Sequence, residues 1–206
     1  MTGKSHWNDV YRARDTEALT WYEAAPGVSM ELIRAHATPG PAVDIGAGTS
    51  HLVDALLDAG FGPVTALDLS DEALAISRAR LGARADQVDW VVGDVTGWQP
   101  APGLGLWHDR AVLHFLTGVA DRAAYVAVMD AALAPGGVAV IGTFADDGPE
   151  KCSGLPVHRY APEALAAEVE RHAPGVFEPL EARRHVHVTP KQNRQNFQFS
   201  VFRKRP

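Results

Sequence analysis

The central part of the chain alternates between short apolar runs and longer segments whose apolar residues recur every three or four positions. Short apolar runs bounded by turn residues predict buried strands, whereas the helical spacing predicts amphipathic helices. The predicted strands cover residues 42–45, 64–67, 88–92, 105–107 and 138–143. The predicted helices cover residues 28–37, 50–59, 71–82, 120–134 and 162–172. Strands that alternate with helices form a parallel sheet, because each helix returns the chain to the start of the next strand.

The C-terminal part departs from this alternation. Residues 176–188 and 197–203 both predict strands, and only a short turn region at residues 190–195 separates them. Two strands joined without a helix pair as an antiparallel hairpin, which we place at the edge of the sheet. The expected fold is an α/β, Rossmann-like, seven-stranded and mostly parallel sheet, with helices on both faces and a C-terminal antiparallel hairpin. Such open sheets bind ligands at the carboxyl ends of their strands.

Composition narrows the class of protein. A chain of 206 residues with 46% apolar residues is typical of one globular domain with a sizeable core. We divide it into an N-terminal helical lid segment, residues 1–40, and a main domain, residues 41–206. The net charge of −6 argues against a nucleic-acid partner, and no apolar run reaches membrane-spanning length. The one cysteine, Cys152, excludes an intrachain disulfide and fits a cytoplasmic location.

Four large aromatic side chains precede the first predicted strand. Trp7 and Tyr11 are four residues apart, so a helix would place them on one face. Trp21 and Tyr22 follow in a predicted loop. These side chains either pack the N-terminal segment onto the domain or form a lid that covers a ligand and excludes water, and the two roles are compatible.

A glycine-rich turn follows the first predicted strand. Asp44 lies at the strand end, and Gly46 and Gly48 come before the next helix. Glycines let the backbone approach a ligand where a Cβ atom would clash, and the helix start offers free N–H groups. The carboxylate of Asp44 favours a cationic ligand over a phosphate. His51 stands where dinucleotide enzymes have a third glycine, so that fingerprint is not met, and an ordinary strand-to-helix turn is the alternative.

Acidic residues also follow the next two predicted strands. Asp68 lies 24 residues after Asp44, where an acid can accept both ribose hydroxyls of an adenosine. Asp94 follows the third strand, where its carboxylate can accept from an adenine amine while the N–H of Val95 faces a ring nitrogen. Each acid alone could simply cap a helix or a turn. Three acids at successive strand ends, after a Gly-x-Gly turn, favour a shared nucleoside site.

One protein family shares this arrangement of strand-end residues, namely Val43–Gly48, Asp68, Gly93-Asp94 and Pro135-Gly136-Gly137. Over nearly its whole length the chain resembles a class I S-adenosylmethionine-dependent methyltransferase. The resemblance implies S-adenosylmethionine as the cofactor, S-adenosylhomocysteine as the product, and no metal. It implies cofactor contacts from the lid and from the strand ends, at Trp7, Tyr11, Trp21, Asp44, Gly46, Ala47, Gly48, Ser50, Asp68, Leu69, Asp94 and Val95.

A further set of residues is similar to the thiopurine and small-thiol branch of these methyltransferases. It comprises residues 106–113, Asp121-Arg122, Tyr125, residues 148–149 and 156–157, and the tryptophan-rich N-terminal segment. His108 and Val112 depart from the branch, which has an apolar or aromatic residue and an alanine at these two places. The resemblance implies methyl transfer to a small-molecule nucleophile, with a sulfur or selenium acceptor favoured over nitrogen or oxygen.

Methyl transfer from a sulfonium is a direct displacement, so the protein must align the reactants and exclude water. A thiol or selenol needs no strong base, whereas an amine or phenol would benefit from a histidine. The candidate catalytic residues are His114, His108 and Asp109. The candidate substrate-binding residues are Tyr22, Arg110, Arg122 and Cys152. The histidines could equally be hydrogen-bonded structural residues, the arginines could pair with neighbouring aspartates, and the cysteine could be a small buried residue.

Other functions remain open on the sequence alone. They are a macromolecular methyltransferase acting on protein lysine or RNA, a non-catalytic nucleotide-binding module, and a dinucleotide dehydrogenase. We expect no metal site, because His185 and His187 share one face of a strand but no third ligand accompanies them. We also expect a small-molecule methyl acceptor, no nucleic-acid or membrane partner, and a monomer or weak homodimer.

Overall fold

The computed structural model of the protein describes residues 3–206. Its centre is a seven-stranded sheet with the strand order β3-β2-β1-β4-β5-β9-β8. In this order the strands are β3 (Val88–Val92), β2 (Val64–Asp68), β1 (Ala42–Ile45), β4 (Leu104–Arg110), β5 (Leu133–Phe144), β9 (Arg194–Lys204) and β8 (Phe177–Val188). The strands from β1 to β5 pair in parallel, and β9 joins β5 and β8 antiparallel. The predicted fold, including the C-terminal hairpin, is confirmed.

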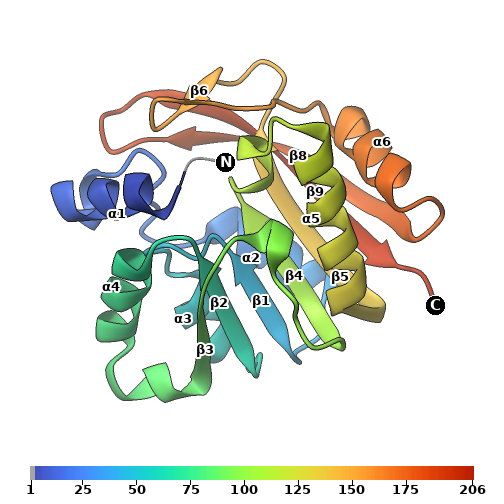
Figure 1. The fold of residues 1–206 in the computed structure, drawn as a ribbon, viewed down its shortest axis with the longest axis horizontal. Coiled ribbons are helices and arrows are strands. Elements are labelled where there is room, and N and C mark those ends of the chain that lie inside the picture. Colours follow the sequence, from blue (N-terminus) through green and yellow to red (C-terminus); the bar gives the residue numbers. More distant parts are fainter. Residues whose placement is uncertain (1–2) are drawn as a thin grey trace.

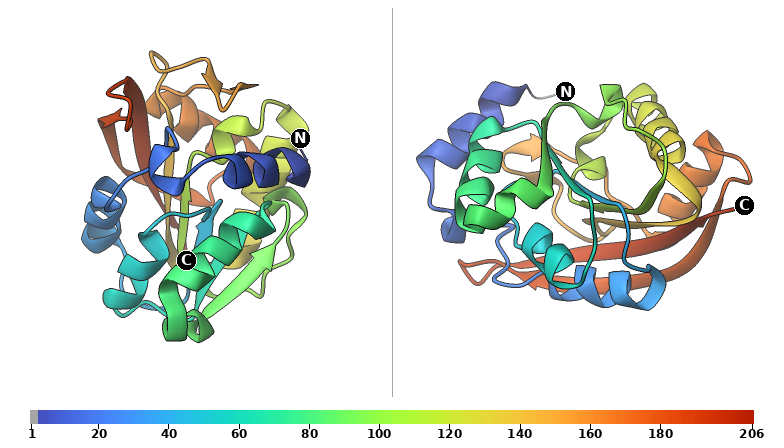
Figure 2. Two further views of the ribbon diagram at one scale, coloured as in Figure 1. Left: turned by 90° about the vertical axis from the view of Figure 1, so that its left-hand side faces the viewer. Right: turned by 90° about the horizontal axis from the view of Figure 1, so that it is seen from below.

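Helices cover both faces of the sheet (Figures 1 and 2). One face carries α2 (Gly27–His36), α3 (Leu52–Asp58) and α4 (Asp71–Leu81), and the other carries α5 (Val119–Ala132) and α6 (Pro162–His172). Leu52 and Leu74 belong to the apolar layer on the first face, and Trp107 and Leu165 to the layer on the second. The N-terminal helix α1 (Lys4–Ala13) lies beside α4 (Figure 1). No helix within residues 3–206 is long and apolar enough to span a bilayer.

Short elements connect these layers. They are the 3-10 helices η1 (Thr16–Ala18), η2 (Gly82–Gln87), η3 (Val95–Gly97) and η4 (Leu113–Phe115), and the strands β6 (Lys151–Cys152) and β7 (Leu155–Pro156). The antiparallel pair β6–β7 lies within a stretch that the sequence pattern predicts to be a loop. Figure 1 shows β6 at the top of the molecule, and β6 and β7 form a two-stranded sheet of their own.

Two strands are longer than the sequence pattern predicts. The pattern ends the fourth strand at residue 107, but β4 continues to Arg110, which pairs with Gly142 of β5. His108 and Asp109 do not end the strand, because both are buried and hydrogen-bonded. The fifth strand, expected at residues 138–143, likewise covers Leu133–Phe144.

Smaller differences concern the ends of other elements. The first helix after β1 begins at Leu52 rather than at residue 50, and β9 begins at Arg194 rather than at residue 197. The turn of the C-terminal hairpin is therefore shorter than expected. These shifts leave the order of the elements unchanged.

Candidate active site

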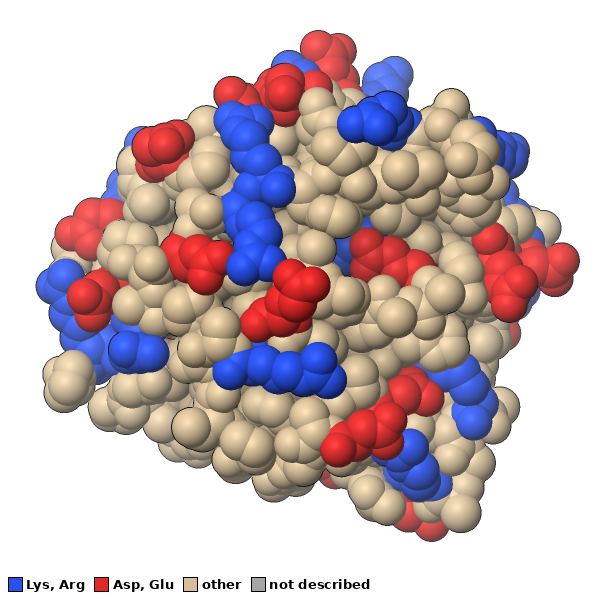
Figure 3. All heavy atoms as spheres, turned by 180° about the vertical axis from the view of Figure 1, so that it is seen from behind, with Lys and Arg blue, Asp and Glu red and all other residues tan. Residues whose placement is uncertain are grey.

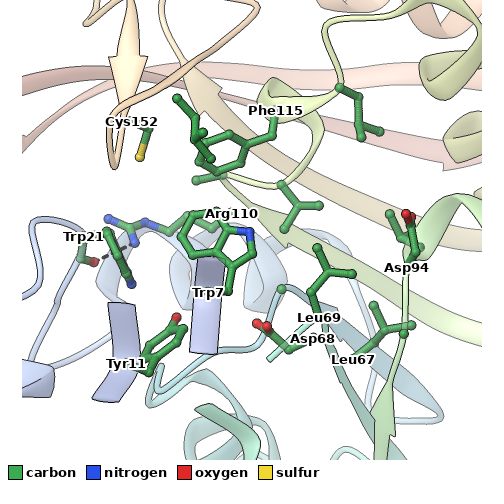
Figure 4. A pocket seen from close by; sticks show the side chains of 17 residues that line it. Trp7, Tyr11, Trp21, Leu67, Asp68, Leu69, Asp94, Arg110, Phe115 and Cys152 are labelled. Atoms are coloured by element: carbon green, nitrogen blue, oxygen red, sulfur yellow. Dashed lines mark hydrogen bonds between the residues drawn. The ribbon is translucent and has the colours of Figure 1, made fainter. Parts of the chain in front are cut away.

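Two adjoining cavities lie at the carboxyl ends of the central strands. The larger one, called here the apolar cavity, is lined by residues of α1, of the strand ends and of the β6–β7 pair (Figure 4), among them Trp7, Asp68, Leu69, Asp94, Val95, Phe115, Cys152 and Leu155. The second, the polar cavity, is lined by Tyr22, Glu23, Ser29, Asp44, Ala47, Gly48, Ser50, His51 and His108. The residues that line both are Tyr11, Trp21, Gly46 and Arg110, called here the junction residues. Every residue expected to bind a cofactor lines one cavity or the other.

Asp68, at the end of β2, is held by the backbone on both of its oxygens. It is 8% exposed and lines the apolar cavity. Its Oδ2 accepts from the Gly48 N–H at 2.9 Å, and its Oδ1 accepts from the Ser70 N–H at 2.7 Å. Burial raises the pKa of Asp68 to about 6, although these hydrogen bonds lower it. Each oxygen keeps a second lone pair, which can accept from a ligand hydroxyl.

Asp94 follows β3 and lies at the opposite end of the apolar cavity from Cys152 (Figure 4). Its Oδ1 accepts from the backbone N–H and the hydroxyl of Thr96, at 2.8 and 2.7 Å, and so caps η3. Both bonds use the same oxygen, so Oδ2 can accept from a ligand amine. The neighbouring Val95 is buried and lines the same cavity.

The two glycines after β1 are required by contacts within the protein. Gly46 and Gly48 have positive φ angles of 66° and 50°. A Cβ atom on Gly46 would lie 2.1 Å from Cγ2 of Val112, and one on Gly48 would lie 2.5 Å from the hydroxyl oxygen of Tyr11. Only glycine combines this backbone conformation with such close neighbours.

Three buried polar side chains form a chain beside the polar cavity. Nδ1 of His108 lies 2.7 Å from Oδ1 of Asp44, and Nε2 lies 2.8 Å from Oγ of Ser29. All three residues are at most 3% exposed. The other carboxylate oxygen, Oδ2 of Asp44, is buried without a hydrogen-bond partner in the described part of the chain. A buried acceptor of this kind fits a ligand that brings a donor, such as an ammonium group.

Arg110 links the sheet to the N-terminal segment. Its Nη1 donates to the carbonyl of Trp21 and its Nη2 donates to Glu23, both at 2.9 Å. The guanidinium also lies 5.1 Å from the ring centre of Phe197. Burial lowers the pKa of Arg110, but an arginine remains charged at neutral pH. The junction of the cavities thus carries a fixed positive charge next to the carboxylate of Glu23.

Aromatic rings enclose the apolar cavity at its Cys152 end. Trp7 lies 6.0 Å from Trp21 and 5.2 Å from Phe115 between ring centres, and Tyr11 lies 6.1 Å from Trp21, all edge to face. Trp7 and Tyr11 share α1, as their spacing predicts. Burial raises the pKa of the Cys152 thiol to about 12, so the thiol stays protonated at neutral pH.

Comparison with known proteins indicates the class of enzyme to which this site belongs. A protein-family model described as a methyltransferase domain matches residues 43–139, which run from β1 into β5 and include all three strand-end acids. The protein is an S-adenosylmethionine-dependent methyltransferase with a methyltransferase domain over residues 43–139. No curated protein sequence matches the methyltransferase.

Solved structures resemble the methyltransferase over nearly its whole length. A structure from work on the conversion of a disulfide bond into a thioacetal group during echinomycin biosynthesis is 24% identical, with a TM-score of 0.77, covering 98% of this chain and 93% of that one. The 1,6-didemethyltoxoflavin-N1-methyltransferase of Burkholderia thailandensis, solved with 1,6-didemethyltoxoflavin and S-adenosylhomocysteine, is 26% identical, with a TM-score of 0.75, covering 98% and 87%. The glycopeptide N-methyltransferase MtfA, complexed with S-adenosylmethionine, is 20% identical, with a TM-score of 0.67, covering 94% and 99%.

Asp109, a candidate catalytic residue, lines neither cavity of the methyltransferase. Side chains alternate along β4, so Asp109 faces α5 while His108 and Arg110 face the cavities. Its oxygens accept from the Tyr125 hydroxyl at 2.7 Å and from the N–H groups of Val112 and Leu113. Burial raises the pKa of Asp109 to about 6. In this position Asp109 fixes the loop whose Val112 lines the apolar cavity.

His114 and Arg122 also lie outside both cavities. His114 is fully buried, and its Nδ1 lies 3.3 Å from the N–H of Phe144. Burial lowers the pKa of His114 to about 3, so its ring is neutral. Arg122 pairs with the buried Glu168 at 2.5 Å and donates to the carbonyl of Leu116 at 3.0 Å. Arg122 therefore ties α5 to α6 and to the loop after η4 in the methyltransferase.

Several lining residues of the methyltransferase do not stand out in its sequence. Glu23 directly follows Trp21 and Tyr22 of the lid segment, and this position next to candidate site residues could have marked it as a lining residue. Ser29 carried no such signal, because its partner His108 lies 79 residues away. Phe115 and Leu155 are apolar residues in irregular segments, which the pattern does not distinguish from core residues.

Proposed function

We propose that the protein transfers a methyl group from S-adenosylmethionine to a small-molecule nucleophile, and that sulfur or selenium acceptors are favoured over nitrogen or oxygen. When bound, S-adenosylmethionine supplies a methyl group already activated on a sulfonium. The protein then has to hold the cofactor, align the acceptor and exclude water. Its own residues support each of these tasks.

The strand-end acids are placed to hold the parts of the cofactor. Asp94 and Val95 would hold the adenine and Asp68 the ribose, all three in the apolar cavity. Asp44, in the polar cavity, would hold the amino-acid end through its unpartnered Oδ2. Tyr11, Trp21 and Gly46 of the junction would then lie beside the sulfonium part, and Glu23 would offset the charge of Arg110. Residues 1–40 would act as the lid segment, since Trp7, Tyr11 and Trp21 line the apolar cavity.

The acceptor proposal rests on the absence of a free general base among the described residues around the Cys152 end of the apolar cavity, where we place the acceptor. The described residues that line the apolar cavity include no histidine and no lysine. His108 is bonded on both ring nitrogens, and His114 lines neither cavity. The Cys152 thiol has a pKa of about 12 and cannot accept a proton. An acceptor that ionises by itself, such as a thiol or selenol, fits these walls better than an amine or phenol.

Arg110 supports the same choice of acceptor. A fixed positive charge lowers the pKa of a neighbouring acid, so it raises the thiolate fraction of a bound thiol. Glu23 neutralises part of this charge, but Glu23 lines the polar cavity, whereas we place the acceptor in the apolar cavity. The aromatic enclosure formed by Trp7, Trp21 and Phe115 restricts the acceptor to a small molecule.

A nitrogen acceptor is the second candidate. The Burkholderia enzyme, which is 26% identical over 98% of the chain, is named as an N1-methyltransferase and was solved with its heterocycle bound. A macromolecular acceptor is less well supported, because acidic and basic side chains are interspersed on the face shown in Figure 3, without a broad basic patch there.

The test is a methylation assay with S-adenosylmethionine and a panel of small thiols, selenols, amines and phenols. Product masses and S-adenosylhomocysteine release would be measured for each acceptor between pH 6 and pH 9. We expect the highest kcat/KM with thiols or selenols, and a rate that rises with the ionisation of the acceptor itself. Exclusive transfer to a ring nitrogen would establish the second candidate, and transfer only to protein or RNA would refute a small-molecule acceptor. Binding of S-adenosylmethionine without turnover of any acceptor would indicate a non-catalytic module.

Three further properties belong to this proposal. We propose that catalysis needs no metal, and no group of three or more metal-ligand side chains is found among residues 3–206. The single, buried cysteine suits a cytoplasmic location. We also propose a monomer or weak homodimer without nucleic-acid or membrane partners.

A further inference from the structure

Ser29, His108 and Asp44 form one continuous hydrogen-bonded chain across two layers of the fold. Asp44 and His108 are direct neighbours in the parallel pairing of β1 with β4. Ser29 reaches them from α2, which packs on that face of the sheet. The two contacts, at 2.7 and 2.8 Å, hold both nitrogens of the histidine ring. The ring therefore cannot rotate without breaking both bonds.

The carboxylate of Asp44 determines which groups donate and which accept in these hydrogen bonds. A carboxylate only accepts, so Nδ1 of His108 donates to Oδ1 of Asp44. In the neutral ring, Nε2 then accepts from the hydroxyl of Ser29. This fixes which oxygen of Asp44 faces His108. The other oxygen, Oδ2, is left buried beside the polar cavity, with no hydrogen-bond partner within residues 3–206.

We propose that His108 and Ser29 are positioning residues that orient Asp44, so that its Oδ2 receives the ammonium group of the cofactor's amino-acid end. The inference rests on the proposed cofactor placement and adds a role for two residues that act on the cofactor through Asp44. On this proposal His108 contributes to cofactor binding and is not a catalytic residue. The binding energy of the amino-acid end would depend on His108, and that of the adenosine end would not.

The same three residue types, in the same order of contacts, form the charge-relay triad of serine hydrolases. In that chemistry the serine needs access to a carbonyl carbon, and the remaining carboxylate oxygen does not serve a ligand. Oδ2 of Asp44 has no hydrogen-bond partner among the described residues and borders the polar cavity, where it can serve a ligand. This feature favours positioning over nucleophilic attack.

The test compares two ligands that differ only at the amino-acid end. S-adenosylhomocysteine carries this end, and 5′-methylthioadenosine lacks it. Their Kd values would be measured by calorimetry for the wild type and for the variants Asp44→Asn, His108→Phe, His108→Asn and Ser29→Ala. Binding of 5′-methylthioadenosine also reports whether a variant is folded.

We expect Asp44→Asn and His108→Phe to weaken S-adenosylhomocysteine by about tenfold or more, because a hydrogen bond to a charged group is lost or misdirected. Binding of 5′-methylthioadenosine should change by less than about twofold, since this ligand makes no contact with Asp44. His108→Asn should restore most of the affinity, because the amide nitrogen of asparagine lies near the place of Nδ1. Ser29→Ala should weaken S-adenosylhomocysteine by about threefold, since only the outer bond is lost.

The matched control is His36→Phe. His36 is the last residue of α2. Its ring also pairs with a carboxylate, that of Glu181 at 2.7 Å, but His36 lines neither cavity. We expect this variant to bind both ligands as the wild type does. If His108→Phe binds neither ligand, Ser29→Ala decides: selective loss of S-adenosylhomocysteine binding supports the proposal, and unchanged binding overturns it.

Two other results would overturn the inference. One is equal weakening of both ligands in folded His108→Phe, which indicates a purely structural role. The other is ester hydrolysis by the wild type that disappears in Ser29→Ala, which indicates a hydrolase triad. Failure of the wild type to bind either ligand would instead refute the cofactor placement itself, and failure of methyl transfer with normal ligand binding would refute only the acceptor proposal.

Discussion

Replacing Asp68 with asparagine should separate ligand binding from stability. Burial raises the pKa of Asp68 from 3.8 to about 6, which corresponds to about 3 kcal/mol against the charged form in the folded state. Because the folded pKa is raised, the stability contribution of this group is complete below pH 3.8 and is lost as the pH rises through 6. At neutral pH, Asp68→Asn removes that cost.

The same substitution also removes a hydrogen bond. The Gly48 and Ser70 N–H groups each donate to one oxygen of Asp68, and an amide offers only one oxygen. One buried N–H therefore loses its acceptor, at a cost of about 1–3 kcal/mol. The two effects oppose each other, so we expect the free energy of unfolding of Asp68→Asn at pH 8 to lie within about 2 kcal/mol of the wild type.

Cofactor affinity should fall much more than stability. Loss of the ribose hydrogen bonds to a charged group should weaken S-adenosylhomocysteine by about 1.5–3 kcal/mol, which is about 10- to 150-fold. At pH 5 the wild type is itself mostly protonated at Asp68, so the difference between wild type and variant should narrow by about tenfold. Calorimetry at pH 5 and pH 8, with urea unfolding in parallel, measures both quantities. Equal affinity of the two proteins at pH 8, or the same ratio at both pH values, would refute the ribose assignment.

Three further substitutions test other parts of the site. Arg122→Ala should lower the unfolding free energy by about 1–3 kcal/mol, because the carbonyl of Leu116 loses its donor and Glu168 loses its buried partner while keeping Arg171 and His172. Urea unfolding measures this, and cofactor affinity of the folded protein should not change. Trp21→Ala should lower kcat/KM more than about tenfold with a small change in Tm if Trp21 excludes water, whereas a loss of Tm alone would indicate packing. Gly46→Ala should destabilise the protein by about 1–3 kcal/mol through strain, and Val112→Ala should recover part of the loss in a double-mutant cycle, since Cγ2 of Val112 is the contacting atom.

The sequence predicted the layers of the fold and the gathering of the three acids at one edge of the sheet, because both follow from local patterns. Strand ends are marked by a change from apolar to polar residues, and parallel strands bring those ends together. Asp44 and Asp68 directly follow apolar residues, and Asp94 comes one glycine after the third apolar run. Their positions beside two adjoining cavities therefore needed no knowledge of long-range contacts.

The catalytic candidates could not be placed from local sequence patterns. The polar residues His108 and Asp109 suggested the end of a strand, but burial and hydrogen bonds keep them inside β4. Once they belong to a strand, they must face opposite sides of the sheet, and only His108 reaches a cavity. Whether a polar residue ends a strand or is buried within it depends on distant partners, such as Ser29 and Tyr125, which a local pattern does not contain.

The β6–β7 pair contributes Cys152 and Leu155 to the apolar cavity, yet it forms a separate two-stranded sheet and does not pair with the described strands of the seven-stranded sheet. Exchanging these few residues would therefore reshape the cavity end that we propose for the acceptor, without moving the strand-end carboxylates. Under the proposed function, substrate range and cofactor use would be separable properties of this scaffold. Libraries confined to residues 151–156 offer a route to new acceptors on an unchanged cofactor-binding framework.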